Sequence, residues 1–404
     1  MLVKTLKGFR DYLPQEARKR QFVMSTLKNV FELYGFEPLE TPVLEYEEIL
    51  TGKYGEEGEK LMYRFEDLGK RRVAMRYDLT IPLSRVVAQY QNDLSIPFKR
   101  YQMQNVWRAE NTQKGRLREF IQCDIDTVGV SSALADAEII LITYAVFERF
   151  RFSDYKILIN DRSVFEGLPM SAITTIDKLK KIGEESVCNE LVKKGITNSR
   201  EEANNLLQSI TQKALTPRLQ EILTLLDHYG VPKNMLEFSP TLARGLDYYT
   251  GLIVEVESPN YPFGSLAGGG RYDNLIGMFT DRKIPAVGIS FGRIFDAVDA
   301  LHLYPPELDN ASTKALITIF SEELKELSVK TSFFLREKNI NTELYLDATT
   351  RLEKQLKYAD QKGIPFAVII GPEEAEKNIV TLKNLQTREQ LQLPLEEVTK
   401  KLLQ

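Results

Sequence analysis

Residues 99–127, KRYQMQNVWRAENTQKGRLREFIQCDIDT, constrain the fold of this chain more than any other stretch. They predict two β-strands joined by a loop at residues 111–116, because successive side chains in a strand point to opposite faces. One face of the second strand is polar or aromatic and the other is apolar. The first face carries Arg118, Phe120, Gln122, Asp124 and Asp126, and the second carries Ile121, Cys123 and Ile125. On the first strand Arg108 and Glu110 share a face. The polar face either meets solvent, as is common in antiparallel sheets, or binds a polar ligand.

The size and composition indicate a globular protein of two or three domains. The chain has 404 residues, of which 43% are hydrophobic and 27% charged, and a chain of this length exceeds one ordinary domain. It contains no long uncharged apolar run, so no membrane association is expected. The first residues, MLVKTLKGFRDYLP, contain no apolar signal core, and we therefore expect a cytoplasmic protein.

The scarcity of cysteine and histidine excludes several kinds of chemistry. Cys123 and Cys188 cannot build a disulfide framework, and His228 and His302 stand beside no carboxylate cluster. We therefore expect no histidine-rich metal site and no Ser/His/Asp mechanism, whereas a carboxylate-bound Mg²⁺ stays open. Catalysis is expected to rely on arginine, carboxylates and tyrosine. The net charge of −4 does not exclude a nucleic-acid partner, because such binding depends on local basic patches.

The N-terminal part predicts a helix, an extended segment and a strand that leads into a helix. Apolar residues at helical spacing predict a helix over residues 15–34. Residues 36–44 contain two prolines, which suit an edge strand or an interface. In residues 72–85, RVAMRYDLTIPLSR, Asp78 and Thr80 either cap the following helix or bind a ligand. A long helix over 131–152 and a strand over 156–160 follow the predicted hairpin.

The middle of the chain predicts an inserted helical unit followed by a return to β-structure. Residues 165–230 are mostly helical, and Ser199 with Glu202 forms a capping-box pattern. A strand is expected over 252–256 and another within 286–292. The glycines at 268–270 predict either a turn or a close approach of backbones. Arg293 stands at a helix start, where it suits an anionic phosphate.

A proline-containing linker separates a C-terminal domain of different pattern. Residues 302–314 are polar and contain Pro305 and Pro306. Beyond them, strands and helices alternate as in a small α/β domain. The predicted organisation is therefore a catalytic domain in two parts, 1–160 and 233–301, a helical insertion at 161–232, the linker, and a domain at 315–404.

The ordered motifs of the chain resemble those of the histidyl-tRNA synthetase family of class II aminoacyl-tRNA synthetases. The motifs are GFRDYLP, ETPVLE, MRYDLTIPLSR, VWRAENTQKGRLREFIQCDID, RGLDYYTG, AGGGRYDNLIGMF and AVGISFG, which span residues 8–292. The resemblance implies an α/β fold with an antiparallel catalytic sheet flanked by helices and a C-terminal anticodon-binding domain. It also implies a homodimer with ETPVLE at the interface.

The activity that the resemblance implies is ligation of histidine to tRNA. ATP and L-histidine form histidyl-adenylate, with Mg²⁺ expected alongside ATP, and the histidyl group passes to the 3′ end of tRNA(His). The histidine-binding residues implied are Asp78, Leu79, Thr80, Arg108, Gln122, Asp126, Arg244, Tyr248 and Tyr249. Those implied for ATP are Arg108, Glu110, Phe120 and Arg293, and those for tRNA are Gln113, Lys114 and Arg116. Arg108 and Arg244 are the catalytic pair, and no residue is assigned to a metal.

These residue types suit adenylate formation. The attacking carboxylate is already ionised, so the barrier lies in bringing two anions together. Arginine stays charged and binds carboxylate or phosphate with two hydrogen bonds. Carboxylates such as Asp78 and Asp126 match an ammonium group, and tyrosine hydroxyls can partner the imidazole nitrogens. The tyrosines could otherwise be core aromatics, and Arg244 with Asp247 could be a surface ion pair.

The last of these motifs, AVGISFG, departs from the family pattern together with the arginine that follows it. The family has two residues between the glycine and the arginine of this motif, whereas here Gly292 directly precedes Arg293. The difference corresponds to about 3 Å along a helix. Two alternatives stay open: a synthetase-like regulatory subunit of histidine biosynthesis that charges no tRNA, and a synthetase for another amino acid such as proline or threonine.

Overall fold

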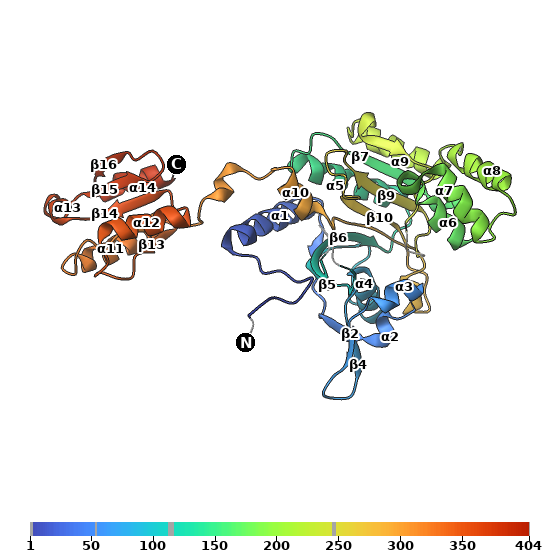
Figure 1. The fold of residues 1–404 in the computed structure, drawn as a ribbon, viewed down its shortest axis with the longest axis horizontal. Helices are drawn as coiled ribbons and strands as arrows, with labels where there is room; N and C mark the ends of the chain where they lie inside the picture. The colour runs from blue at the N-terminus through green and yellow to red at the C-terminus, as the bar shows by residue number, and fades with distance from the viewer. Residues whose placement is uncertain (1–2, 53–54, 112–116, 245–247, 404) are drawn as a thin grey trace. The chain divides into compact units, whose positions relative to one another are not determined.

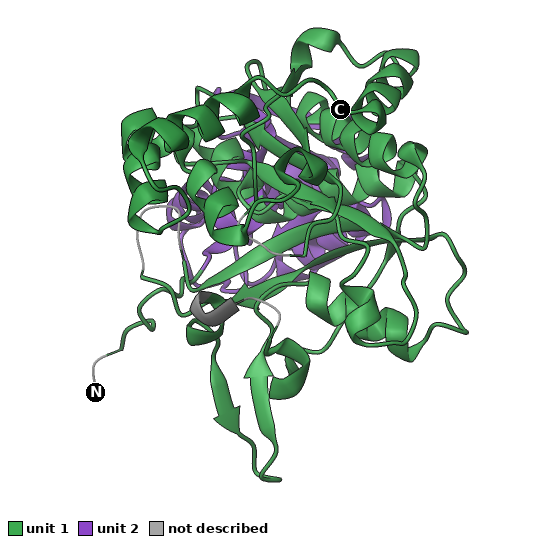
Figure 2. Ribbon diagram, turned by 90° about the vertical axis from the view of Figure 1, so that its right-hand side faces the viewer, with its two compact units in different colours: residues 1–11, 20–303 green, residues 12–19, 304–404 purple. Residues whose placement is uncertain are grey.

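The computed structural model describes residues 3–52, 55–111, 117–244 and 248–403. The chain divides into two compact units, shown in green and purple in Figure 2. Unit 1 comprises residues 1–11 and 20–303, and unit 2 comprises residues 12–19 and 304–404. Unit 1 is not divided further, so the insertion at residues 161–232 remains a prediction from the sequence.

Unit 1 is built on an eight-stranded sheet whose order is β1-β5-β6-β11-β10-β9-β7-β8 (Figure 1). The β1/β5 and β7/β8 pairs at the two edges are parallel, and the pairs between them are antiparallel. The prediction of a mainly antiparallel sheet flanked by helices is confirmed. In chain order the strands are β1 Glu37–Pro38, β5 Phe98–Trp107, β6 Glu119–Val128, β7 Lys156–Asp161, β8 Leu236–Phe238, β9 Leu252–Glu257, β10 Ala267–Arg271 and β11 Ala286–Ser290.

Two helices cover the apolar face of this sheet. Helix α1 (Pro14–Leu33) and helix α5 (Ala133–Arg149) meet the sheet through aromatic rings. The ring centroid of Phe291 lies 5.7 Å from that of Phe31 and 6.4 Å from that of Phe147. Ile125, on the same face, is fully buried. The apolar half of the alternation in residues 119–128 therefore packs on a core, as its pattern predicts.

The predicted hairpin is present, but its first strand is shorter than expected. Arg100 pairs with Asp126 and Trp107 with Glu119, where β5 ends. The backbone N–H of Arg108 still bonds the carbonyl of Arg118 at 2.9 Å, but that of Ala109 turns away and bonds Leu61 at 2.8 Å. The expectation that Arg108 and Glu110 share a strand face is therefore wrong, because the chain leaves the sheet between them.

A small three-stranded sheet and a helix lie beside the polar face of the large sheet. The strands, in the order β2-β4-β3, are β2 Leu44–Tyr46, β4 Arg72–Met75 and β3 Arg64–Glu66. Helix α4 (Thr80–Gln89) follows β4, and the short helices α2 (Glu47–Leu50) and α3 (Gly55–Lys60) lie between β2 and β3 in the chain. The buried Arg76 donates to the carbonyls of Thr41 at 2.7 Å and Asn105 at 2.8 Å. This contact ties the extended ETPVLE segment to β5.

The helical stretch between β7 and β8 forms its own core. Its helices are α6 Met170–Ile176, α7 Leu179–Lys193, α8 Arg200–Thr211 and α9 Pro217–His228, preceded by the 3-10 turn Arg162–Phe165. The apolar residues of α6, α7 and α8 pack around Ile173, Leu191 and Leu207, whereas α9 packs against α5. Ser199 accepts from the backbone N–H of Glu202 at 3.1 Å, which confirms the Ser199 half of the predicted capping box. The Glu202 carboxylate accepts from the backbone N–H of Asn198 at 2.7 Å instead of from that of Ser199. After β11, unit 1 ends with helix α10 (Ile294–Ala300).

Unit 2 is an α/β domain with a five-stranded sheet in the order β13-β12-β14-β15-β16. Its strands are β12 Ala315–Ile317, β13 Thr342–Leu344, β14 Phe366–Ile369, β15 Val380–Asn384 and β16 Gln390–Leu393, and its helices are α11 Lys325–Glu337, α12 Leu352–Lys362, α13 Pro372–Lys377 and α14 Leu395–Leu403. The sequence did not indicate α13 or β16.

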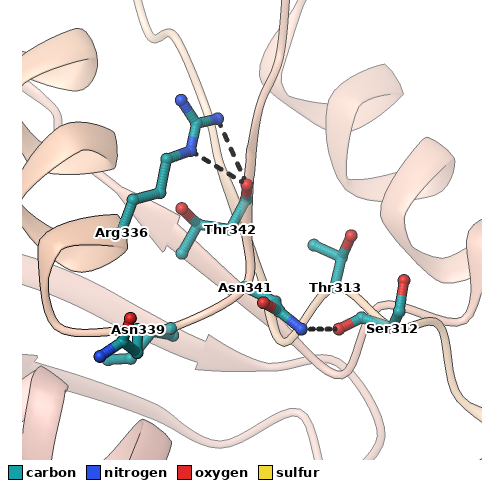
Figure 3. A pocket seen from close by; sticks show the side chains of 7 residues that line it. Ser312, Thr313, Arg336, Asn339, Asn341 and Thr342 are labelled. Carbon is teal, nitrogen blue, oxygen red and sulfur yellow. Dashed lines mark hydrogen bonds between the residues drawn. The ribbon is translucent and has the colours of Figure 1, made fainter.

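A hollow of about 550 Å³ lies beside β13, where Arg336 donates to the carbonyl of Thr342 and Asn341 to that of Ser312 (Figure 3). In the part of the chain that the structure describes, no helix has both the length and the apolarity needed to cross a membrane.

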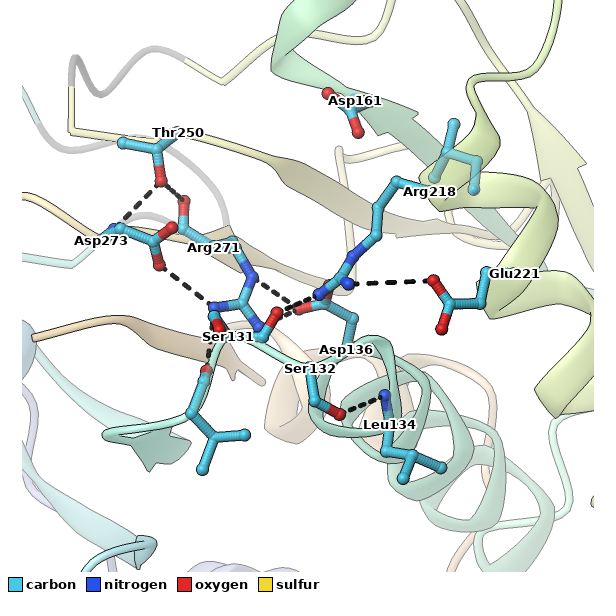
Figure 4. A network of polar contacts seen from close by, with 12 residues as sticks. Ser131, Ser132, Leu134, Asp136, Asp161, Arg218, Glu221, Thr250, Arg271 and Asp273 are labelled. Atoms are coloured by element: carbon cyan, nitrogen blue, oxygen red, sulfur yellow. Dashed lines mark hydrogen bonds and ion pairs between the residues drawn. The ribbon is translucent and has the colours of Figure 1, made fainter.

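A buried carboxylate fixes α5, α9 and β10 to one another. Asp136 of α5 is fully buried and lies between two guanidinium groups (Figure 4). Arg271 binds one of its oxygens at 2.6 and 2.9 Å, and Arg218 of α9 binds the other at 2.7 and 2.9 Å. The backbone carbonyl of Arg271 in turn accepts from the N–H of Thr250 at 2.7 Å. The network therefore reaches the segment that follows residue 247.

We predict that Asp136→Asn lowers the free energy of unfolding by about 3–5 kcal/mol, because it removes the buried charge between Arg218 and Arg271 and leaves Arg271 only the partly exposed Asp273. Denaturant unfolding of both proteins measures this difference. Asp273→Asn is the matched control. It removes a partly exposed carboxylate 3.1 Å from the same Arg271, and we expect it to cost about 1 kcal/mol or less. Equal effects of the two variants would contradict the prediction.

Candidate functional site

The polar face of the large sheet carries two rows of residues that cross the strands. Side chains directly opposite each other on neighbouring strands share a face, so the register fixes the rows. One row runs Gln102, Asp124, Ser290, Gly268, Glu255, and the other runs Arg100, Asp126, Gly288, Gly270, Ile253. The charged groups of the first row are therefore Asp124 and Glu255, and those of the second are Arg100 and Asp126. Glycines occupy the middle.

The glycines leave room for side chains that lie across the sheet. A Cβ atom on Gly268 would stand 2.3 Å from Nη1 of Arg244, and one on Gly288 would stand 1.9 Å from Oδ1 of Asp126. A Cβ atom on Gly270 would meet the ring of Tyr249 at 2.9 Å. The glycines at 268–270 thus form a strand rather than a turn. The close-approach alternative describes Gly269 and Gly270, where a Cβ atom would stand 2.1 Å from the carbonyl oxygen of Gly288 and 2.3 Å from that of Leu252. The missing side chains of Gly268 and Gly270 also make space for Arg244 and Tyr249.

Arg244 is held by a carboxylate from the floor of the site. Its Nη1 lies 2.7 Å from Oε2 of Glu255, which belongs to β9. Burial acts to lower the pKa of Arg244, but Tyr249 and Glu255 outweigh it and the pKa lies above its ordinary value. The guanidinium therefore stays charged and is fixed over Gly268. Asp247, its alternative partner by sequence, lies outside the described residues.

Tyr248 and Tyr249 lie between this arginine and the carboxylates. Their ring centroids are 4.8 Å apart, and Tyr248 also meets the ring of Tyr272 edge-on at 5.9 Å. Burial raises the pKa of both hydroxyls, with Asp78 adding to the effect at Tyr248 and Arg244 opposing it at Tyr249. Both phenols are therefore neutral hydrogen-bonding groups. They pack with other aromatic rings, as the core-aromatic alternative predicts, and they also face charged side chains.

Asp126 is held from two sides at the bottom of the site. Its Oδ2 lies 2.7 Å from Nη2 of Arg100, which is fully buried, and its Oδ1 accepts the hydroxyl of Tyr272. Burial raises the pKa of Asp126, while Arg100 and Tyr272 act to lower it. Gln122, on the same face of β6, donates through Nε2 to the hydroxyl of Ser290 at 3.2 Å.

Asp78, Leu79 and Thr80 form the start of helix α4. Oδ1 of Asp78 accepts from the backbone N–H of Ile81 at 3.1 Å, as the capping alternative predicts. The carboxylate also interacts electrostatically with Asp124 and Tyr248, so it faces the site as well. Leu79 is fully buried. Thr80 is the first residue of α4.

Arg108 lies between two aromatic rings at the edge of the site. Its guanidinium carbon is 4.4 Å from the ring centroid of Tyr77 and 5.1 Å from that of Phe120, and Nε donates to the carbonyl of Tyr77 at 3.1 Å. The carbonyl of Glu110 accepts from Nε of Arg118 at 3.0 Å. Rings and guanidinium planes of this kind suit stacking on a base. Gln113, Lys114 and Arg116 lie outside the described residues.

Arg293 contacts a different segment from the other candidate residues. It precedes helix α10, its Nη1 donates to the carbonyl of Phe263, and its charge acts on the hydroxyl of Tyr261. A Cβ atom on Gly264 would stand 2.9 Å from Nη1, so this loop closes over the guanidinium. The contacts of Arg293 therefore run to residues 261–264.

The site carries both cations and anions. Arg108 and Arg244 offer guanidinium groups, whereas Asp78 and Asp126 offer carboxylates, with the tyrosine pair beside them. Such a surface suits a zwitterionic amino acid together with an anionic group such as phosphate. Among the described residues no group of three or more histidine, cysteine or acidic side chains is placed to hold a metal ion.

The comparisons with known proteins agree on one family. The family model described as histidyl-tRNA synthetase matches residues 8–194 and 176–293, and the model described as anticodon binding domain matches residues 314–404. The chain belongs to the histidyl-tRNA synthetase family. The histidine–tRNA ligase of Cytophaga hutchinsonii is 40% identical and that of Bacteroides fragilis strain YCH46 is 39% identical, over 98% and 97% of both chains.

The solved structures support the same family. The crystal structure of histidyl-tRNA synthetase from Nostoc sp. PCC 7120 is 32% identical, with a TM-score of 0.85 over all of both chains. A Bacillus halodurans chain titled as an ATP phosphoribosyltransferase regulatory subunit/histidyl-tRNA synthetase is 20% identical, with a TM-score of 0.71 over 89% of this chain. That likeness shows the shared fold alone.

Several residues of this synthetase-family site were not singled out from the sequence. They are Arg100, Tyr272, Glu255 and Ser290. Arg100 carried a signal, because residues 100, 102 and 104 are polar and alternate with Tyr101 and Met103. Glu255, Tyr272 and Ser290 carried none, since only the pairing of distant strands brings them to the site.

We predict opposite outcomes for two neighbouring glycines of β10. In Gly269→Ala the new Cβ meets backbone atoms, at 2.1 Å from the carbonyl oxygen of Gly288 and 2.6 Å from Cα of Ile289. In Gly268→Ala it meets only the flexible end of Arg244. Gly269→Ala should therefore lower the free energy of unfolding by about 3 kcal/mol and Gly268→Ala by about 1 kcal/mol or less. Denaturant unfolding tests this, and a larger loss for Gly268→Ala would contradict it.

Proposed function

We propose that this protein is a histidine–tRNA ligase, which activates L-histidine with ATP and transfers the histidyl group to the 3′ end of tRNA(His). The observation that carries the proposal is the placement of Arg244, held 2.7 Å from Glu255 over Gly268, with the tyrosine pair and Asp126 beside it. Relatives about 40% identical over nearly the whole chain are named histidine–tRNA ligases. The regulatory-subunit alternative is therefore not favoured.

Binding of histidine uses both ends of the amino acid and its ring. Asp78, Asp126 and the side-chain oxygen of Gln122 are acceptors for the ammonium group. Tyr248 and Tyr249 are neutral phenols that can pair with the imidazole nitrogens, and such pairing rejects analogues more strongly than an apolar pocket does. Leu79 and Thr80 complete the wall at the start of α4.

The first chemical step needs orientation and charge rather than a base. The histidine carboxylate attacks the α-phosphorus of ATP, the bond to the β-phosphate bridging oxygen breaks, and pyrophosphate leaves. Arg108 and Arg244 bring the two anions together and oppose the charge that develops on the phosphoryl oxygens. Arg244 suits this role because Glu255 fixes its orientation in advance.

The nucleotide is expected at the edge that carries Arg108 and Phe120. The stacked ring and guanidinium offer a platform for adenine, and Glu110 offers an acceptor for its amino group. Arg293 is proposed for the γ-phosphate, on the strength of its position before α10. Mg²⁺ is proposed to arrive with the ATP phosphates, since Mg²⁺ commonly binds through phosphates and few protein ligands.

tRNA binding is proposed for unit 2 and for residues 113–116. The match of residues 314–404 to an anticodon binding domain supports the first part, and Gln113, Lys114 and Arg116 are proposed to contact the acceptor end.

A homodimer is proposed through the ETPVLE segment and the small sheet. Val43, Leu44, Tyr46 and Phe65 there are each more than 40% exposed, which suits an interface. A cytoplasmic location is also proposed, because the relatives of the chain are histidine–tRNA ligases.

We predict that Arg244→Lys lowers histidine-dependent ATP–pyrophosphate exchange by about 10²–10³-fold, because lysine cannot hold two oxygens in the same fixed geometry. Gly268→Ala should lower exchange as well, since its Cβ displaces the same guanidinium without removing it. Arg282→Lys, at an exposed position in a loop, is the control and should leave exchange unchanged. Near-normal exchange by Arg244→Lys would refute the role of Arg244. Absence of exchange with histidine in the unaltered protein would refute the proposed function.

A further inference from the structure

The short segment that leads into Arg244 is fixed by side chains from two directions. From the sheet, Asn160 of β7 donates through Nδ2 to the carbonyls of Pro240 at 3.1 Å and Leu242 at 2.8 Å. Asn160 is fully buried, so its side chain is shielded from water. The sheet therefore holds the chain as far as residue 242, two positions before Arg244.

Ala243, the residue directly before Arg244, is held from the helical stretch between β7 and β8. Its backbone N–H donates to Oδ1 of Asp177 at 3.1 Å, and Asp177 is the C-terminal cap of α6. Ala243 is 2% exposed and belongs to the same apolar cluster as Ile173 and Leu191. The helices therefore hold the backbone next to the proposed catalytic arginine, although they are not part of the sheet that carries most of the candidate residues.

Asp177 also lies beside the ion pair that Arg244 forms. Its carboxylate interacts electrostatically with Glu255, Lys181 and Arg244. Burial raises the pKa of Asp177, and the hydrogen bond from Ala243 is the largest effect that opposes this rise. The carboxylate has lost hydrogen bonds to water, and the N–H of Ala243 replaces one of them.

Arg244 is a long side chain whose two ends are fixed separately. At one end its Nη1 lies 2.7 Å from Oε2 of Glu255, and at the other its backbone directly follows Ala243. A displacement of about 1 Å in a group that orients reactants can cost about 10²-fold in rate. The hydrogen bond between Ala243 and Asp177 therefore bears on the rate, although the proposed reaction gives Asp177 no contact with substrate.

We propose that Asp177 is a positioning residue for adenylate formation, whose carboxylate fixes the backbone of Ala243 and thereby the place of the Arg244 guanidinium. This inference rests on the proposed function and deepens it. It gives the helical stretch a part in the first chemical step, because the end of α6 places the arginine that meets the histidine carboxylate and the α-phosphate. The role requires an acceptor oxygen, so an uncharged side chain with an oxygen at the same position can replace Asp177.

The test measures histidine-dependent ATP–pyrophosphate exchange by Asp177→Ala in the whole chain, with kcat expressed per active site. Active sites are counted from the single-turnover burst of histidyl-adenylate, so unfolded molecules do not enter the value. We expect kcat per site to fall about tenfold or more, because an N–H that has lost a charged acceptor no longer holds the segment in place. The KM for ATP should change less than about twofold, since Arg108 and Phe120 are untouched.

Three further variants separate positioning from folding. Asp177→Asn keeps an acceptor oxygen, so its kcat per site should stay within about threefold of that of the unaltered protein. Asp177→Leu lacks the acceptor but keeps the volume of the side chain, and it takes the place of Asp177→Ala if alanine prevents folding. The matched control is Glu202→Ala, which removes another carboxylate of the helical stretch that accepts a backbone N–H, that of Asn198 at 2.7 Å. It should leave kcat per site unchanged.

A double-mutant cycle tests whether Asp177 acts through Arg244. Arg244→Ala leaves no guanidinium to place, so adding Asp177→Ala to it should lower kcat per site by less than about twofold. An equal loss in both backgrounds would overturn the proposal. Unchanged kcat per site in the acceptor-free variants, or a loss in Asp177→Asn as large as theirs, would also overturn it. These outcomes presuppose exchange by the unaltered protein, and the absence of that exchange would instead refute the proposed function.

Discussion

The absence of side chains at Gly268, Gly270 and Gly288 is the constraint on which the site depends. Their strands pair in register, so the three glycines open one continuous area of bare backbone on the polar face of the sheet. Arg244 and Tyr249 lie across this area, and Asp126 stands at its border. Any Cβ atom there would overlap one of these groups. The pairing of the backbone strands therefore determines the shape of the site, because it brings the three glycines together.

The second requirement is that buried charges be held in fixed positions. Arg100 with Asp126, Arg244 with Glu255, and Arg271 with Asp136 each join a guanidinium to a carboxylate at 2.6–2.7 Å. Pairs of this kind add little net stability, because desolvation offsets much of their attraction. Their value here is orientation, since a group that is already fixed loses less entropy when a substrate binds. The aromatic packing of α1 and α5 on the opposite face contributes to the stability of unit 1.

The sequence predicted what is local and periodic. The alternation in residues 119–128, the helical stripe of α1 and the Ser199 cap each depend on neighbours in the chain, and each is present. The end of β5 could not be predicted, because Ala109 leaves the sheet for a partner 48 positions earlier, at Leu61. Glu255 and Ser290 reach the site only through strand pairing over long separations. The glycine motif fell between these cases, since its composition permits a turn and only the register makes it a strand.

The network around Asp136 joins the helical stretch to the site by a short path. Arg218 of α9 binds one oxygen of Asp136, and Arg271 binds the other. Arg271 also fixes Thr250 through its carbonyl, directly after Tyr248 and Tyr249. A shift of α9 acts first on the Arg218–Asp136 pair, and because Asp136 is fully buried, solvent cannot readily replace a lost partner there. The same carboxylate is joined through Arg271 to Thr250. Helix α9 is therefore connected by one buried carboxylate to the segment of Tyr248 and Tyr249.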